Sequence, residues 1–152
     1  MSARIVPSSR QLLGLIAGGA LGLLLWELSA RVLAPQIIGG PMEPAGLIQA
    51  LAAKMLGLQL GKLPAEGVHY ATGLIGYPIG YWILSRIVSF GSAIDGVIWG
   101  VVTWFLALGV FAWLAGFGFL LGYGNLTWLS LMGHLLYGMA AVSVFHDLAD
   151  RR

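Results

Sequence analysis

Long runs without charged residues alternate with short charged segments along this chain. A membrane-spanning helix needs about 20 consecutive apolar residues, and a charge inside lipid is costly, so charged positions mark the ends of spans. The pattern predicts an all-α integral membrane protein, with residues 1–152 forming a single membrane domain. Four transmembrane helices are expected, near residues 11–33, 67–87, 94–121 and 127–146.

Residues 96–146 include no formally charged side chain and are long enough for two spans. We place the turn between them at residues 122–125, because glycine and asparagine favour tight turns. The first apolar run also admits a second interpretation, since Arg4 and Arg10 precede it as in a cleaved signal sequence. Its length, and the bulky Leu28 ahead of the cleavage position, favour a retained helix.

A shorter helix is expected at residues 44–58, between the first two spans. Prolines in this segment disfavour another crossing, and Pro44 suits a first helical turn. One face of the helix would be apolar, so we interpret it as an interfacial amphipathic helix on the outer membrane surface or over the bundle. The residues of that face are Leu47, Leu51, Met55 and Leu58.

Lys and Arg residues near the ends of the spans predict the orientation, because cytoplasmic loops carry more of them. The more basic side holds both termini, which are therefore expected in the cytoplasm. Its residues are Arg4, Arg10, Arg86, Arg151 and Arg152. The opposite side holds Arg31, Lys54 and Lys62.

The composition narrows the classes of function. Hydrophobic residues make up 59% and charged residues 9% of the chain, whereas about 25% of an average soluble domain is charged. The net charge of +2 is small and scattered, which excludes a nucleic-acid surface. Without cysteine there are no disulfides or thiolate metal sites. The expected partners are the lipid bilayer and other membrane subunits or a second copy of the chain.

The 23 glycines are spaced so that several share a helix face. Small residues let helix backbones approach closely in lipid, where apolar burial alone drives no association. Pro78, between two of these glycines, also admits a flexible gate, although most such prolines form static kinks. The predicted packing positions are Gly14, Gly18, Gly22, Gly73, Gly76, Gly80, Gly96, Gly100 and Gly138.

A few ionisable residues are expected within or near the spans, where such groups are functional candidates. Glu27 and Arg31 share a face of the first span because they are four residues apart. His69 begins the second span and His134 lies in the fourth, and these helices run in the same direction. Both histidines should therefore lie in the outer half of the membrane. The predicted polar cluster beside them comprises Glu27, Arg31, Glu66 and Tyr137.

His69 and His134 leave two interpretations open. Imidazoles on facing helices can bind a haem or a quinone headgroup. A haem needs both ligands at a similar depth, which their different distances from the helix ends disfavour. Hydrogen bonds across helices are the simpler expectation. No metal site and no catalytic residues are predicted, and Asp95 is expected to pair with Arg86 at the cytoplasmic surface.

The motif at residues 133–138, Gly-His-Leu-Leu-Tyr-Gly, and the position of His69 resemble small four-helix inner-membrane proteins of the YagU-like type. In these proteins the third span also carries Gly and Trp, as Gly100 and Trp104 do here. The third span lacks the proline expected near its outer end. The resemblance implies a bacterial inner membrane and no particular reaction. It implies importance for His69, His134, Tyr137 and Gly138.

These observations favour a non-enzymatic membrane protein that acts as an accessory, assembly or oligomer-forming component of a membrane complex. The first alternative is a haem-, quinone- or pigment-associated redox protein that uses His69 and His134. The second is a small transporter or proton pathway at Glu27. We expect no bound cofactor if the protein is an accessory component, and a haem or quinone if it is a redox protein.

Overall fold

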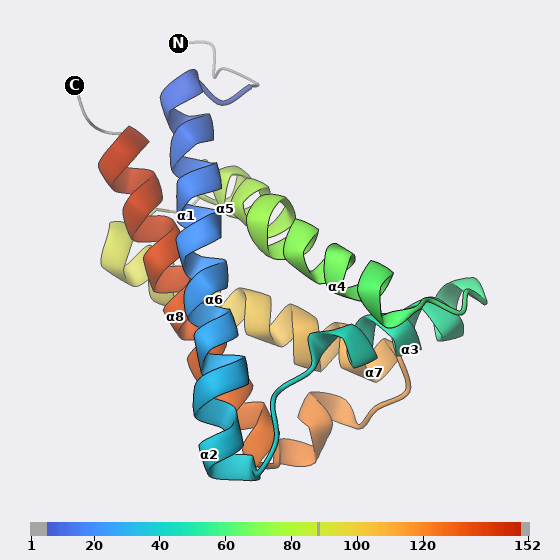
Figure 1. Cartoon of the computed structure of the whole chain (residues 1–152). Helices are drawn as coiled ribbons and strands as arrows, with labels where there is room; N and C mark the ends of the chain where they lie inside the picture. Colours follow the sequence, from blue (N-terminus) through green and yellow to red (C-terminus); the bar gives the residue numbers. More distant parts are fainter. Residues whose placement is uncertain (1–5, 88, 150–152) are drawn as a thin grey trace.

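The computed structural model describes residues 6–87 and 89–149, and within these ranges every regular element is helical (Figure 1). The predicted all-α class is therefore confirmed. In this part of the chain η1, η2 and η3 are π-helical turns inside longer helices, and η4 is a short 3-10 turn. In chain order the elements are α1 (Ser9–Leu28), η1 (Ser29–Leu33), α2 (Ala34–Ile38), α3 (Pro44–Leu56), α4 (Lys62–Ala71), η2 (Thr72–Gly76), α5 (Tyr77–Leu84), α6 (Ser92–Trp104), η3 (Phe105–Phe111), α7 (Ala112–Leu114), η4 (Phe119–Tyr123) and α8 (Asn125–Ala149).

Among the described residues, three helical stretches are long and apolar enough to cross a membrane: Ser9–Ile38, Ser92–Leu114 and Asn125–Ala149. They correspond to the predicted first, third and fourth spans. The predicted second span lies in the continuous helix of α4, η2 and α5, which is not one of the three. That helix begins at Lys62 instead of residue 67, so charged side chains occupy its first turns.

Prolines and glycines explain the other differences in helix ends. The first helix continues beyond residue 33 because η1 widens it ahead of Pro35, whose ring would clash in a regular α-helix. In η2, ahead of Pro78, the amide of Tyr77 likewise bonds to a carbonyl five residues back. The third helix ends at Leu114 and not at residue 121, because Gly116 adopts a φ of 95° that breaks it.

The connection from α7 to α8 follows a left-handed backbone path. Leu120, Leu121 and Tyr123 have φ values of 48°, 52° and 61°, a conformation that costs L-residues about 1–2 kcal/mol each. The Thr127 hydroxyl donates to the Leu120 carbonyl at 2.5 Å, and the Trp104 indole donates to the Thr127 carbonyl at 3.1 Å. These bonds hold the turn, which overlaps the predicted one at residues 122–125.

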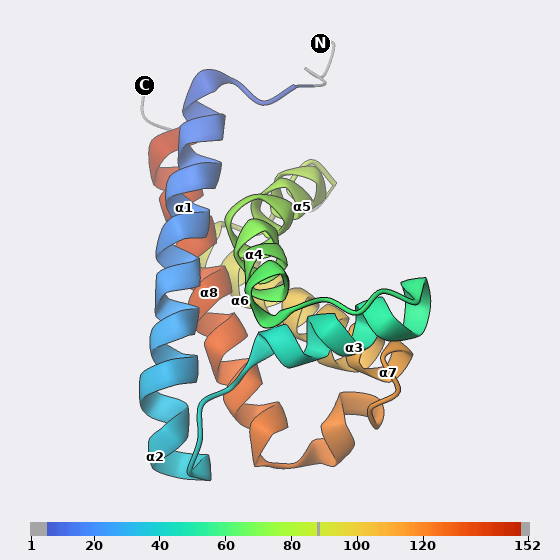
Figure 2. The same cartoon turned by 45° about the vertical axis from the view of Figure 1, so that its right-hand side comes forward.

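α1 and α8 form a closely packed antiparallel pair (Figures 1 and 2). Gly14, Gly18 and Gly22 of α1 face the backbone of α8. A Cβ atom on Gly14 or Gly22 would lie 3.1 or 2.8 Å from a carbonyl oxygen of α8, and one on Gly18 would overlap the Ala141 carbonyl. This glycine stripe therefore packs against α8 of the same chain.

α6 packs on α8 in the same manner. A Cβ atom on Gly96 would lie 2.8 Å from the Cα of Met139, and one on Gly100 would lie 2.7 Å from the His134 carbonyl oxygen. Gly138 of α8 meets the backbone of α6 even more closely. α8 is thus the central helix, with glycine contacts to both α1 and α6.

The remaining glycines show how α5 is placed. A Cβ atom on Gly73 or Gly80 would lie 2.8 or 2.9 Å from side chains of α1 and α6, whereas one on Gly76 would have no neighbour closer than 3.9 Å. Gly76 is therefore not a close packing position. A Cβ atom on Gly19 would lie 2.7 Å from the ring of Pro78, so α1 packs against the widened turn. The helix around Pro78 is therefore closely packed against α1.

α3 lies beside α4 and α7, away from the α1–α8 pair (Figures 1 and 2). Its predicted apolar face is divided. Leu47 and Leu51 line a cavity, whereas Met55 and Leu58 are about half exposed. Only the first half of the amphipathic face is thus covered by the rest of the protein.

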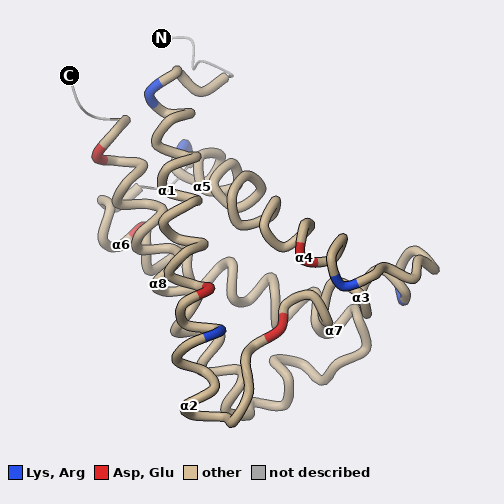
Figure 3. The backbone as a smooth tube through the Cα atoms, in the orientation of Figure 1, with Lys and Arg blue, Asp and Glu red and all other residues tan. Residues whose placement is uncertain are grey.

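Charged residues gather in two groups on the backbone (Figure 3). One group lies near the beginning of α1, the end of α8, the end of α5 and the beginning of α6. The other lies around the end of α1 and around α3 and α4. The basic residues Arg4, Arg151 and Arg152, on which the predicted orientation partly depends, lie outside the described residues.

Candidate functional site

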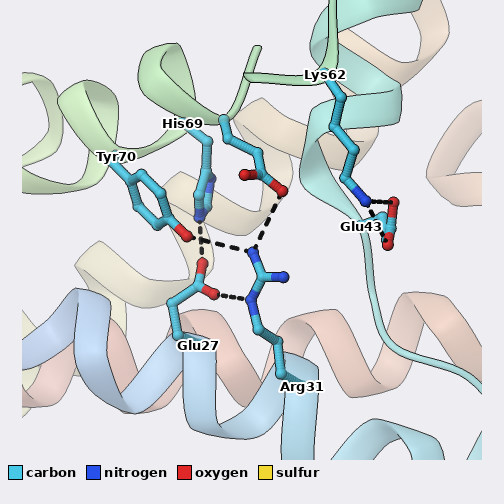
Figure 4. Close-up of polar contacts among 7 residues, drawn as sticks. Glu27, Arg31, Glu43, Lys62, His69 and Tyr70 are labelled. Atoms are coloured by element: carbon cyan, nitrogen blue, oxygen red, sulfur yellow. Dashed lines mark hydrogen bonds and ion pairs between the residues drawn. The ribbon is translucent and has the colours of Figure 1, made fainter. Parts of the chain in front are cut away.

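Five side chains from α1, η1 and α4 form a polar network, defined as Glu27, Arg31, Glu66, His69 and Tyr70 (Figure 4). Arg31 makes an ion pair with Glu27, one helical turn away. The Nε2 atom of His69 lies 2.9 Å from Oε1 of Glu27. Nη2 of Arg31 lies 3.3 Å from the Tyr70 hydroxyl and 3.8 Å from Oε1 of Glu66. The structure thus brings Glu27, Arg31 and Glu66 together with His69, as the charge pattern predicts, and adds Tyr70.

The network lies at the edge of the protein. The side chains of Glu27 and His69 are 16% and 15% exposed, whereas that of Arg31 is 40% exposed. A carboxylate can only accept hydrogen bonds, so His69 donates its Nε2 proton to Glu27. Glu27 is thereby satisfied by two donors, which supports a structural ion cluster.

Two polar contacts connect α3 to the start of α4. Lys62 and Glu43 form an ion pair at 3.1 Å between exposed side chains (Figure 4). The Gln49 amide donates to the Leu60 carbonyl at 2.8 Å. The exposed pair contributes little to stability, but together these contacts fix the position of α3 relative to α4.

Trp26 connects the two histidines. The sequence pattern favours an interfacial anchor at this position, yet the side chain is buried. Its ring centroid lies 4.9 Å from that of His69 and 6.0 Å from that of His134. Trp26 directly precedes Glu27 in the sequence, and neighbouring helical residues lie at a similar depth. The position of Glu27 was therefore the signal that Trp26 lies at the level of the histidines.

His134 is 6% exposed and is bonded mainly within α8. Its Nδ1 atom lies 2.8 Å from the Ser130 carbonyl oxygen and 3.3 Å from the Ser130 hydroxyl. The indole nitrogen of Trp26 also lies 3.3 Å from Nδ1. Tyr137 lies outside the polar network, because its hydroxyl donates to the Gly73 carbonyl at 2.6 Å.

A cavity of about 450 Å³, called here the central cavity, lies between α1, α3, the α4–α5 helix, η3 and α8. Its walls are mainly apolar, with side chains such as Leu23, Leu108 and Phe111. The two histidines are part of the wall, together with four residues that carry a hydroxyl group: Thr72, Tyr77, Ser130 and Tyr137. Neither Lys nor Arg is among the described residues that line it, and Glu43 is the one acidic residue there.

Asp95 and Tyr81 form a second polar site near the start of α6. Asp95 is 5% exposed and accepts hydrogen bonds from the amide of Phe90 at 2.8 Å and the hydroxyl of Ser89 at 3.0 Å. The Tyr81 hydroxyl lies 2.8 Å from Nε2 of His146. The expected pairing of Asp95 with Arg86 is not observed between these described residues, because the Arg86 guanidinium lies 4.2 Å from the ring of Trp82. The bonds from Ser89 and Phe90 to Asp95 hold the segment that precedes α6 against the first turn of that helix.

Within the described residues, no group of three or more His, Cys, Asp and Glu side chains is arranged to hold a metal ion. Each histidine beside the central cavity has one ring nitrogen bonded within the protein. The other nitrogen of each ring has no hydrogen-bond partner among the described residues.

Comparison of the chain with protein-family models, with curated proteins and with solved structures gives no match. The arrangement of the chain's own residues therefore carries the functional argument.

Proposed function

We propose that this protein holds a membrane-soluble, largely apolar ligand with a small hydrogen-bonding head in the central cavity, without catalysing a reaction. The observation that carries the proposal is the position of His69 and His134 in the wall of an otherwise apolar cavity. Ligand sites in proteins typically enclose about 300–1,000 Å³ and combine apolar walls with a few polar groups. The central cavity has both properties.

The charge of the lining favours a neutral ligand. A carboxylate or phosphate headgroup would need a cation or several donors in this apolar surrounding, since a buried charge must be paired. The lining offers no Lys or Arg among the described residues, and its one acidic residue, Glu43, already forms an ion pair with Lys62. Of the ligands considered from the sequence, a quinone or a neutral pigment fits this lining better than a fatty acid.

We also propose a topology of four spans in a bacterial inner membrane, with both termini in the cytoplasm. Arg10 and Glu27 are separated along α1 by about 25 Å at 1.5 Å per residue, close to the thickness of the hydrocarbon core. The polar network then lies at the outer interface, and α4 to α5 forms the second span. α3 becomes the interfacial helix, which places the central cavity next to lipid.

The proposal is tested by purifying the protein in a mild detergent and analysing an organic extract by mass spectrometry and absorption. We expect a neutral apolar compound in amounts comparable to the protein. Gly46 of α3 lines the cavity and has no atom within 4 Å of a Cβ position, so Gly46→Phe should fill the cavity and reduce the compound several-fold.

Gly67→Phe is the matched control. Gly67 is also helical and has open space at its Cβ position, but it does not line the cavity. This variant should retain the compound. If no apolar compound accompanies the parent protein, or if both variants retain it equally, the cavity is not its binding site.

A further inference from the structure

The neutral ring of His134 has a possible partner at Nδ1 for either tautomer, and the closest of them, the Ser130 carbonyl, favours the tautomer with the proton on Nδ1. A neutral imidazole has one N–H donor and one bare acceptor nitrogen. The Ser130 carbonyl, 2.8 Å from Nδ1, accepts a proton carried there. The Trp26 indole N–H and the Ser130 hydroxyl, both 3.3 Å from Nδ1, can donate when that nitrogen is bare. Partners for both states of Nδ1 are therefore already in place.

The other nitrogen of His134, Nε2, has no hydrogen-bond partner among the described residues, and His134 lines the central cavity. A polar atom in a buried apolar site is costly when it lacks a partner. When Nδ1 carries the proton, Nε2 is an acceptor for a hydroxyl group. When Nδ1 is bare, Nε2–H is a donor for a carbonyl group. A ligand in the cavity can therefore form a hydrogen bond with His134 through either a hydroxyl or a carbonyl group.

His69 differs because Glu27 fixes its tautomer. Its Nε2 proton is donated to the carboxylate of Glu27, 2.9 Å away. In the neutral ring Nδ1 is then always an acceptor, and no described residue bonds to it. His69 also lines the central cavity, so it favours a ligand that offers a hydroxyl group.

From this geometry we propose that the central cavity binds a membrane-soluble quinone in both its oxidised and reduced forms, with the hydroquinone bound more tightly. The inference rests on the proposed function and names its ligand. A quinone carries carbonyl oxygens and a hydroquinone carries hydroxyl groups at the same positions, and both are neutral. His134 can bond to either form, whereas His69 accepts only from the hydroxyl form. No electron transfer is assigned to this chain.

Calorimetric titration of the full chain in zwitterionic lipid nanodiscs tests the proposal with three probes. These are a decyl-substituted benzoquinone, its hydroquinone kept reduced without oxygen, and the dimethyl ether of that hydroquinone, which cannot donate. One neutral hydrogen bond contributes about 0.5–1.5 kcal/mol, or roughly 2- to 13-fold in affinity. We expect the hydroquinone to bind about 2- to 10-fold more tightly than the quinone, and the ether to bind most weakly.

Glu27→Gln provides the sharper test. A carboxamide can donate as well as accept, so His69 is released to carry its proton on Nδ1 and to donate to a carbonyl group. The variant should bind the quinone and hydroquinone with nearly equal affinity. His134→Gln, which keeps a donor and an acceptor, should retain the affinity for both better than His134→Phe.

The outcomes separate this inference from the proposed function. Equal affinities of the parent protein for all three probes would overturn the assignment of a quinone while leaving an apolar ligand site intact. The same holds if none of the three binds although another apolar compound accompanies the purified protein. If none of the three probes binds and no apolar compound accompanies the purified protein, the proposed function is overturned as well. The probe series on the parent protein decides the question even if a histidine variant does not fold.

Discussion

Tyr137 is the residue that fastens α8 to the kinked helix. Its side chain is 2% exposed, and its hydroxyl donates to the carbonyl of Gly73 within η2 at 2.6 Å. Ring contacts with Tyr77 accompany this bond. A π turn changes which carbonyls are bonded within the helix, so a donor from another helix is well placed at this point.

Tyr137→Phe should therefore destabilise the protein by about 1–2 kcal/mol, because it removes one hydrogen bond and leaves a buried carbonyl with one partner fewer. The free energy of unfolding in mixed detergent micelles measures the effect. Tyr123→Phe, at a position that is 56% exposed, should change it by less than about 0.5 kcal/mol. Equal losses in the two variants would contradict the role assigned to the Tyr137 hydroxyl.

At the residue scale, spacing and charge predict part of the site. Glu27 and Arg31 are four residues apart on a helix, so their pairing follows from the sequence. Trp26 does not follow, because an aromatic residue near a span end can face lipid or the bundle, and only the rotation of α1 against α8 decides which. Tyr137 lies in the same part of α8 as His134, yet its hydroxyl points to a backbone carbonyl that no sequence pattern marks.

At the scale of elements, the apolar runs predict which segments are helical but not how they bend. A π turn ahead of Pro35 or Pro78 adds a residue to one turn and rotates everything that follows. Helical periodicity counted through such a turn goes out of phase. The apolar face of α3 is divided for a different reason. The parts of the protein that cover Leu47 and Leu51 do not extend over Met55 and Leu58.

The glycine contacts of α1 predict a large effect from one methyl group. Gly18→Ala should destabilise the protein by about 1–3 kcal/mol, since the new Cβ would overlap the Ala141 carbonyl and force α1 away from α8. Thermal stability in detergent measures this effect directly.

Gly76→Ala is the appropriate comparison, because its Cβ would have no neighbour closer than 3.9 Å. It should be neutral or slightly stabilising, since alanine favours helix by up to about 1 kcal/mol over glycine. A loss at residue 76 as large as that at residue 18 would show that the glycine stripe of α1 is not a special packing surface.

At the scale of the molecule, the proposed topology assigns each connection to a side of the membrane. The chain contains no cysteine, so single cysteines can be introduced for labelling. Gln59→Cys, between α3 and α4, should react with a membrane-impermeant maleimide in intact spheroplasts. Ile87→Cys, which is 77% exposed in the parent, should react only after permeabilisation. The reverse pattern would invert the topology.

The central position of α8 also has a consequence for biogenesis. α8 carries the contacts that join α1 and α6 into one bundle, yet it follows both of them in the chain and is synthesised after them. Under the proposed topology, the glycine faces of α1 and α6 lie against lipid without their partner until α8 is inserted, and such incompletely packed intermediates are vulnerable to misassembly and degradation. A chain interrupted before residue 125 should be cleared by membrane proteases, whereas α8 supplied as a separate segment should restore the bundle.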